Sequence, residues 1–262
     1  MNIAISNIAW LAEHDNQMYS YLQNAGFIGL EIAPTRIFPQ LPYEKIIYAK
    51  KFANQLKADY GLSIPSMQSI WFGKSERIFG STEERNILID YTKKAIDFAE
   101  EIGCNNLVFG CPKNRIYETD NDINIATSFF RELGEYAKTH HTIFSMEPNP
   151  VLYGTNFINS TQEAFDFVKV VKCDGFKVNV DSGTILYNEE SLHSVEDNIQ
   201  LVNHIHISEP NLEVIKKREL HTQLAEILRK KDYQGFVSIE MRTQNNLDTI
   251  LNVMQYIKEV FV

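Results

Sequence analysis

The sequence predicts an α/β fold, specifically a (β/α)8 barrel. Short apolar runs rich in β-branched residues alternate with longer amphipathic stretches, and eight such pairs occur along the chain. The 262 residues give about 33 residues per pair, which suits the βα units of a barrel of about 250 residues. No linker or abrupt shift in composition divides the chain, so we expect a single domain over residues 1–262.

The expected elements follow from this alternation. The strands cover residues 3–10, 28–33, 63–70, 106–110, 142–147, 177–181, 202–207 and 236–241. The helices cover about residues 14–25, 43–60, 83–102, 121–140, 161–172, 190–200, 214–231 and 245–260. Ser160 and Thr161 open one of these helices with Glu163 in its first turn. We expect Gly61, Gly103 and Gly235 where the chain leaves a helix.

The main rival fold is an open, doubly wound parallel sheet. Such a sheet often carries a glycine-rich phosphate turn after its first strand. Here the first strand instead leads into Ser-Asn-Ile-Ala-Trp at residues 6–10. The absence of that dinucleotide fingerprint favours the closed barrel.

Composition and charge exclude several classes of partner. Lys plus Arg total 25 against 34 Asp plus Glu, a formal net charge of −9, which opposes binding to a phosphate backbone. Nucleic acid is therefore not expected as a partner. Cys104, Cys111 and Cys173 show no CxxC spacing, which suits free thiols in a reducing compartment. Since neither an export signal nor about 18 consecutive apolar residues occur, we expect a cytoplasmic protein without a membrane span.

Four consecutive expected strands, the fifth to the eighth, carry Glu147, Asp181, His206 and Glu240 at their carboxyl ends. The spacings of 34, 25 and 34 residues are each about one βα unit, so these groups should lie at matching heights in the barrel mouth. Three carboxylates converging there repel one another unless a cation neutralises them. We therefore expect a divalent metal, with Mn²⁺ first and Mg²⁺, Co²⁺ or Zn²⁺ as alternatives. Alternation also turns His204 inward, one layer deeper, in a packing or supporting role.

These motifs resemble the sugar phosphate isomerase/epimerase family of xylose isomerase-like barrels, in the AP endonuclease 2 superfamily. The resemblance covers almost the whole chain through Glu-Pro-Asn at 147–149, Asp-Ser-Gly at 181–183, His-Ile-His at 204–206 and Ile-Glu at 239–240. It implies that Glu147, Asp181, His206 and Glu240 hold the metal. It also implies that Glu147 and Glu240 act as acid and base, and that the protein forms a homo-oligomer.

The chemistry expected of such a site is proton transfer on a small carbohydrate. A divalent ion stabilises the enediolate that forms when a carbon-bound proton is removed next to a carbonyl. One carboxylate accepts the proton and the other returns one, which gives epimerisation or isomerisation according to where it is returned. We therefore expect a sugar or sugar phosphate isomerase/epimerase. Two alternatives stay open, namely a dehydratase acting on a polyol or keto-acid, and a sugar-binding barrel without catalysis.

Two positions depart from the ketose 3-epimerase members of the family. Those enzymes carry a substrate-binding histidine three residues after the metal aspartate and an arginine six after the metal histidine, where this chain has Thr184 and Leu212. The metal core can persist while the substrate changes, so a ketohexose is not the expected substrate. Loss of turnover is the other consequence these positions leave open.

Six further residues are candidates for contact with the substrate. Lys113 and Arg115, two cations after the fourth strand, could bind a phosphate or carboxylate. The amide of Gln68 and the indole of Trp71, at the end of the third strand, could contact the face of a sugar. An amide after the fifth strand and a cation after the eighth complete the set. The candidates are Gln68, Trp71, Lys113, Arg115, Asn149 and Arg242.

Overall fold

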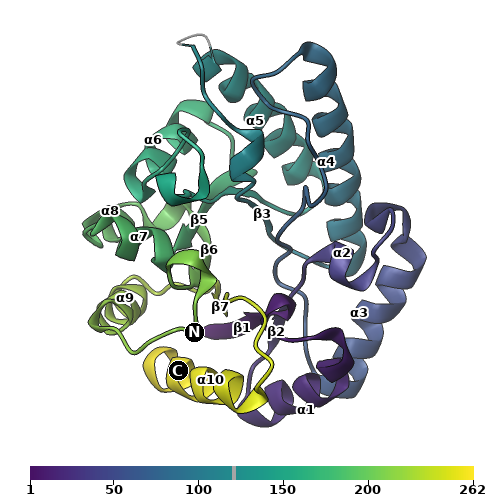
Figure 1. Cartoon of the computed structure of the whole chain (residues 1–262), viewed down its shortest axis with the longest axis vertical. Coiled ribbons are helices and arrows are strands. Elements are labelled where there is room, and N and C mark those ends of the chain that lie inside the picture. The colour runs from purple at the N-terminus through teal and green to yellow at the C-terminus, as the bar shows by residue number, and fades with distance from the viewer. Residues whose placement is uncertain (120–121) are drawn as a thin grey trace.

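The computed structural model describes residues 1–119 and 122–262 and confirms the predicted barrel. Figure 1 looks into this barrel, with strands around the centre and helices forming an outer ring. Within the described residues, seven strands pair in parallel in the order β2-β1-β7-β6-β5-β4-β3. Their bounds are β1 Asn2–Ser6, β2 Gly29–Glu31, β3 Leu107–Phe109, β4 Phe144–Met146, β5 Phe176–Asp181, β6 Val202–Ile207 and β7 Phe236–Ile239.

The segment 63–67 closes the ring between β2 and β3. We expected a strand over 63–70, but the segment forms only isolated bridges, at Ser63 and Met67. Pro65 lies between them and has no N–H to donate to a neighbouring strand. Backbone hydrogen bonds still join the segment to both edges, from Ile32 N to Ser66 O at 3.1 Å and from Val108 N to Met67 O at 2.8 Å.

Helices cover the outside of the strands (Figure 1). Their bounds are α1 Asp15–Ala25, α2 Pro34–Ile37, α3 Ile46–Tyr60, α4 Thr82–Ile102, α5 Asp122–Thr139, α6 Thr161–Val171, α7 Ser182–Asn188, α8 His193–Asp197, α9 Glu219–Lys230 and α10 Leu247–Phe261. Residue 121, the expected start of one helix, lies outside the described residues. Among the described residues, none of the helices combines the length and apolar character that crossing a bilayer requires.

The helix ends follow the predicted signals with two exceptions. Ser160 and Glu163 form a capping box at the start of α6, and Gly61 and Gly103 end α3 and α4 in the left-handed conformation. Gly235 was predicted wrongly as a helix end, because α9 stops at Lys230. In place of one helix over 190–200, α7 starts directly after β5 and the shorter α8 follows. The poor helix propensity of glycine within the first turn of α7 hid that helix from the sequence pattern.

An aromatic cluster fixes the strands β3, β4 and β5 against α5. The ring centroid of Phe130 in α5 lies 5.0 Å from Phe109, 5.8 Å from Phe144 and 5.0 Å from Phe176. All four side chains are fully buried. Such aromatic pairs add about 0.5–1.5 kcal/mol each beyond the burial of their area. The cluster therefore gives rigid support to the strands that lead into the barrel mouth.

Candidate metal centre and pocket

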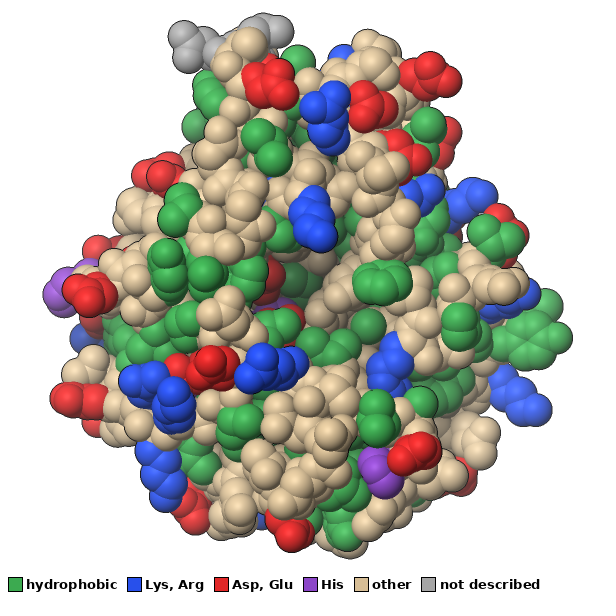
Figure 2. All heavy atoms as spheres, in the orientation of Figure 1, with side chains coloured by type: hydrophobic (Ala, Val, Ile, Leu, Met, Phe, Trp, Pro, Cys, Tyr) green, Lys and Arg blue, Asp and Glu red, His purple; other side chains and the backbone are tan. Residues whose placement is uncertain are grey.

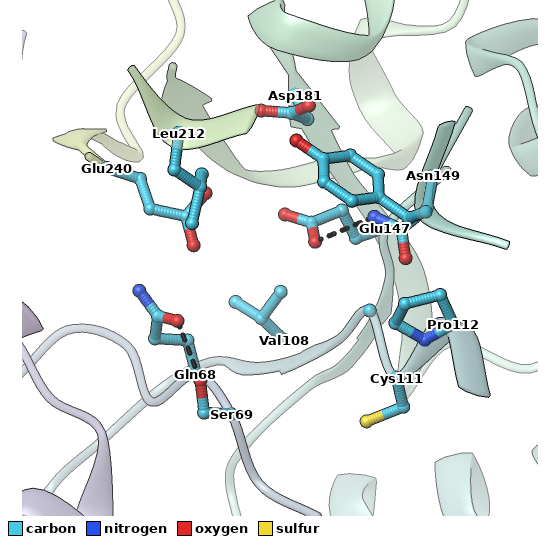
Figure 3. A pocket seen from close by; sticks show the side chains of 12 residues that line it. Gln68, Ser69, Val108, Cys111, Pro112, Glu147, Asn149, Asp181, Leu212 and Glu240 are labelled. Carbon is cyan, nitrogen blue, oxygen red and sulfur yellow. Dashed lines mark hydrogen bonds between the residues drawn. The ribbon is translucent and has the colours of Figure 1, made fainter. Parts of the chain in front are cut away.

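Four side chains converge where β4, β5, β6 and β7 end. Glu147 directly follows β4, Asp181 is the last residue of β5, His206 lies within β6 and Glu240 directly follows β7. Each offers a ligand atom, and these atoms all lie within 4.8 Å of one another. Figure 3 shows the carboxylates of Glu147, Asp181 and Glu240 pointing toward one another into a pocket. The four residues could hold one metal ion.

Hydrogen bonds hold the carboxylate of Glu147 in place. Asn179 donates its side-chain N–H to Oε1 of Glu147 at 2.8 Å, and Asn149 donates to Oε2 at 3.3 Å. The guanidinium of Arg115 in turn donates to Oδ1 of Asn149 at 2.7 Å and to the backbone carbonyl of Glu147 at 2.9 Å. Three buried polar residues thus orient Glu147, Asn179 directly and Arg115 partly through Asn149.

Asp181 has a second task as the N-cap of α7. Its Oδ2 accepts the backbone N–H of Thr184 at 2.8 Å, and the Thr184 hydroxyl lies 2.8 Å from the same oxygen. Its Oδ1 accepts the hydroxyl of Ser208. The departure at Thr184 therefore places a residue that fixes a ligand carboxylate where the ketose 3-epimerases have a histidine.

The ring of His206 lies between two groups of carboxylates. Its Nδ1 is 2.8 Å from Oε1 of Glu147 and 3.2 Å from Oε2 of Glu240, and its Nε2 is 3.0 Å from Oε2 of Glu31. Burial alone would lower the pKa of His206, but Glu31 and Glu240 outweigh it and hold that pKa well above its ordinary value. These carboxylates thus favour a positive charge at this position.

The electrostatics of the donor set fit a cation. Burial, together with the charge of Glu147, raises the pKa of Asp181, and burial raises the pKa of Glu240. Both carboxylates are buried close to another carboxylate, and a bound cation would favour their charged forms. Three carboxylates and one imidazole are an oxygen-rich donor set of the kind that suits Mn²⁺ or Mg²⁺. We conclude that the residues present fit a divalent metal ion.

Above these groups lies a pocket of about 190 Å³. Figure 2 shows the molecule hollowed at this place, with acidic and histidine side chains visible inside. The volume is below the roughly 300–1,000 Å³ typical of sites for drug-sized ligands, so the pocket suits a small molecule. Its lining consists of Gln68, Ser69, Val108, Gly110, Cys111, Pro112, Glu147, Asn149, Tyr153, Asp181, Leu212 and Glu240.

Two of the six expected substrate contacts line this pocket. Gln68 lies near its floor and donates to the Ser6 hydroxyl at 2.8 Å. Asn149 stands beside Glu147, as Figure 3 shows. Leu212, the second departure from the ketose 3-epimerases, is also part of the lining and makes the wall there apolar.

The other four candidates do not line the pocket. Trp71 is buried in the core, donates to the Thr92 hydroxyl at 2.8 Å and packs edge-on against Phe109. Arg115 is fully buried and donates to Asn149 and to the backbone carbonyl of Glu147.

The two remaining cations are exposed and are not among the lining residues. Lys113 is exposed on the short turn Pro112–Asn114, and Arg242 is exposed, with its backbone N–H bonded to Leu212. Trp71, Lys113, Arg115 and Arg242 are thus not among the lining residues, and their contact with the substrate stays a prediction.

Several supporting residues escaped the sequence analysis. Asn179 lies two residues before Asp181, and Ser208 two residues after His206. Since side chains two apart in a strand point to the same face, alternation alone could have found both. Val108 and Gly110 have no such signal, because only the closed ring of strands brings them to the pocket.

Comparison with known proteins identifies the family. The model of the xylose isomerase-like TIM barrel family matches residues 20–260, so the chain belongs to this family, as its motifs indicated. At the level of sequence, no match to a curated protein was found.

Solved structures share the fold over almost their whole length. A 3-keto-D-glucoside 4-epimerase from E. coli is 21% identical with a TM-score of 0.79, covering 99% of both chains. A D-psicose 3-epimerase from Clostridium cellulolyticum H10 is 16% identical with a TM-score of 0.78, covering 100% of this chain and 99% of the other. A probable 3-DHS dehydratase from Bacillus anthracis is 13% identical with a TM-score of 0.70, covering 99% and 98%. These identities establish a common fold.

Proposed function

We propose that this protein is a divalent-metal-dependent epimerase of a small, uncharged sugar, with Glu147 and Glu240 as its acid and base. The observation that carries the proposal is the convergence of three buried carboxylates and one imidazole at the floor of a small pocket. Glu147, Asp181, His206 and Glu240 would hold the ion, with Mn²⁺ as the first candidate.

The two glutamates approach the pocket from opposite sides (Figure 3). One carboxylate accepts the proton from a carbon beside the sugar carbonyl, and the other donates a proton to the opposite face of that carbon. The bound ion supplies positive charge that stabilises the oxyanion developing on the sugar. Removal from one face and return to the other inverts the carbon, so this placement favours epimerisation over aldose–ketose isomerisation.

The charges of the residues that line the pocket limit the class of substrate. Among the described residues that line the pocket there is neither a lysine nor an arginine, whereas Glu147, Asp181 and Glu240 are all acidic. Apart from the proposed metal ion, a phosphate or carboxylate inside this pocket would meet negative charge without a cationic partner. The pocket therefore favours a neutral sugar, like those named for the two epimerases of similar structure.

Dehydration of a keto-acid is the second candidate. The similarity to the probable 3-DHS dehydratase supports it, since the same metal and bases can also eliminate water. The acidic lining opposes it, because a keto-acid carries a carboxylate. A binding protein without turnover is a further alternative that an exchange experiment separates from an enzyme.

The test measures metal content and proton exchange together. We expect one divalent ion per chain in the purified protein and none in the Asp181→Ala, His206→Ala double variant. In D₂O, we expect the wild type to introduce deuterium at one carbon of a neutral keto-sugar, followed by NMR, and the variant to introduce none. Each sugar is paired with its phosphate ester, which we expect to exchange much more slowly.

The contrary outcomes are distinct. A wild-type protein without stoichiometric metal contradicts the metal centre. Faster exchange of the phosphate ester contradicts the neutral substrate but leaves the epimerase mechanism standing. Water elimination from a keto-acid selects the dehydratase. Sugar binding that is equal in wild type and Glu147→Gln, with exchange in neither, selects the binding protein.

A further inference from the structure

The two nitrogens of His206 face different carboxylates. Nδ1 lies 2.8 Å from Glu147 and 3.2 Å from Glu240, which both reach the pocket. Nε2 lies 3.0 Å from Oε2 of Glu31, on the far side of the ring. The His206 side chain is fully buried, so water does not compete for either nitrogen. The ring is therefore held from both ends.

Glu31 reaches this ring from the opposite side of the barrel. It is the last residue of β2, while His206 belongs to β6, and the Glu31 side chain is fully buried. The same Oε2 lies 3.0 Å from Nε2 of His204, which is close enough for an ion pair but lacks the direction of a hydrogen bond. Gln68 contacts the other oxygen of Glu31 at 3.5 Å. Glu31 is thus engaged with neighbours inside the barrel and does not line the pocket.

We infer that Glu31 is a positioning residue that fixes the ring orientation and tautomer of His206, so that Nδ1 is the nitrogen offered to the metal. This rests on the proposed metal centre. A neutral imidazole carries one N–H, and an acceptor at Nε2 keeps the proton there, which leaves the Nδ1 lone pair facing Glu147 and Glu240. Carboxylates that accept the second N–H of a ligand histidine also raise its basicity.

A different use of the same residues would be a second metal site. Glu31, His204 and His206 also offer ligand atoms within 4.8 Å of one another. If both sites were filled, His206 would bind one ion through each nitrogen and would have to lose both ring protons. The hydrogen bond from Nε2 to Glu31 needs no such loss, so the geometry favours one ion and a supporting carboxylate.

The test compares Mn²⁺ binding by wild type and Glu31→Gln. Calorimetric titration with MnCl₂ is expected to give one ion per chain in both, with the dissociation constant about 10–100-fold larger in the variant. Glu13→Gln, which changes an exposed carboxylate in the same half of the chain, serves as the matched control and should bind Mn²⁺ like the wild type. Circular dichroism and thermal unfolding verify that both variants fold.

Two results would overturn the inference. One is a folded Glu31→Gln protein whose Mn²⁺ affinity stays within threefold of wild type. The other is two ions per wild-type chain with one lost in Glu31→Gln, which would make Glu31 a ligand. If the wild type binds no Mn²⁺, the proposed metal centre fails as well. Wild-type binding with an unchanged variant refutes only the role of Glu31.

A measurement on the unaltered protein makes the result independent of how the variant folds. In protein labelled with ¹⁵N-histidine and loaded with ¹¹³Cd²⁺, we expect ¹¹³Cd coupling at Nδ1 of His206 and a proton on its Nε2. Coupling at Nε2, or at both nitrogens, would contradict the tautomer.

Discussion

The two halves of the barrel carry different parts of the candidate site. The half made of β4, β5, β6 and β7 supplies all four members of the ligand set. The half made of β1, β2, the segment 63–67 and β3 supplies none of them, and contributes Glu31 and Gln68 beneath the site. All the groups that would bind the ion thus come from one half, whereas the groups that contact them come from both halves, such as Asn179 in β5 and Glu31 in β2.

Exposure separates the acidic residues of the two halves. Glu147, Asp181 and Glu240 are 8%, 6% and 7% exposed at the pocket, whereas Glu31 is 0% exposed. A ligand from solution can reach the first three but not the fourth. Burial pushes the pKa of Glu31 upward, but His206 and His204 outweigh it and keep the pKa below its ordinary value. The comparison teaches that depth and neighbouring histidines together distinguish otherwise similar carboxylates.

The largest loss of turnover is expected from substitution of Glu147 and Glu240, the proposed acid and base in the half of the barrel made of β4 to β7. Glu147→Gln and Glu240→Gln keep the side-chain shape but remove the proton acceptor, so each should lower kcat by about 10²–10⁴-fold. Glu226→Gln, an exposed substitution on α9, is the control and should retain full turnover. Turnover within tenfold of wild type in both variants would contradict the assignment. Metal analysis of each variant separates loss of the base from loss of the ion.

The buried cation Arg115, which follows β3, tests how one half of the barrel supports Glu147 in the other half. Arg115→Met leaves the carbonyl of Glu147 and Oδ1 of Asn149 without a donor, so the free energy of unfolding should fall by roughly 2–4 kcal/mol. Lys113→Met alters the exposed lysine two residues earlier and should change it by less than about 0.5 kcal/mol. Urea unfolding measures both. Equal losses would show that burial of Arg115 does not matter.

Gly110, which follows β3, tests how closely one half of the barrel packs against Glu147 in the other half. A Cβ added there would lie 2.8 Å from Oε2 of Glu147, so Gly110→Ala should displace this carboxylate. Because small misplacements of reacting groups are costly, we expect kcat to fall by about tenfold. The melting temperature should change little, since a side chain can move aside. Unchanged turnover would mean that the position of Glu147 tolerates such a shift.

The smallest effect is expected on the stability at low pH, through His221, which lies outside the candidate site. Burial lowers the pKa of His221 in α9 to about 4, with Glu209 opposing the shift and Arg218 adding to it. The unfolded chain binds this proton near pH 6.5, so stability is fully present above pH 6.5 and is lost as the pH falls toward 4. The expected loss is at most roughly 3 kcal/mol. Urea unfolding from pH 7 to 4 should show a flatter dependence in His221→Gln, and an equal slope would contradict the prediction.

Much of the fold could be predicted from the pattern of apolar residues. The alternation of strands and helices indicated the barrel, and the paired signals at Ser160 and Glu163 marked a real helix start. Errors arose where local chemistry overrode the pattern. Pro65 limits the segment 63–67 to isolated bridges, and Asp181 starts a helix at once by capping it.

The candidate site was predictable only where position along a strand decides position in space. Spacings of about one βα unit between neighbouring strands located Glu147, Asp181, His206 and Glu240, because parallel strands end at one rim. Loop residues follow no such rule. Lys113 and Arg115 are two residues apart, yet one is exposed and the other buried.

The sequence by itself determined the barrel and the ring of four ligand candidates, since both depend on periodicity within single strands and on the repeat between them. Only the tertiary structure decided that Glu31 meets His206, 175 positions away in the sequence, and that Arg115 supports Glu147 from behind. The physical reason is that contacts across a closed ring depend on how the whole sheet curves and closes, and on which rotamer each side chain adopts in the space that remains.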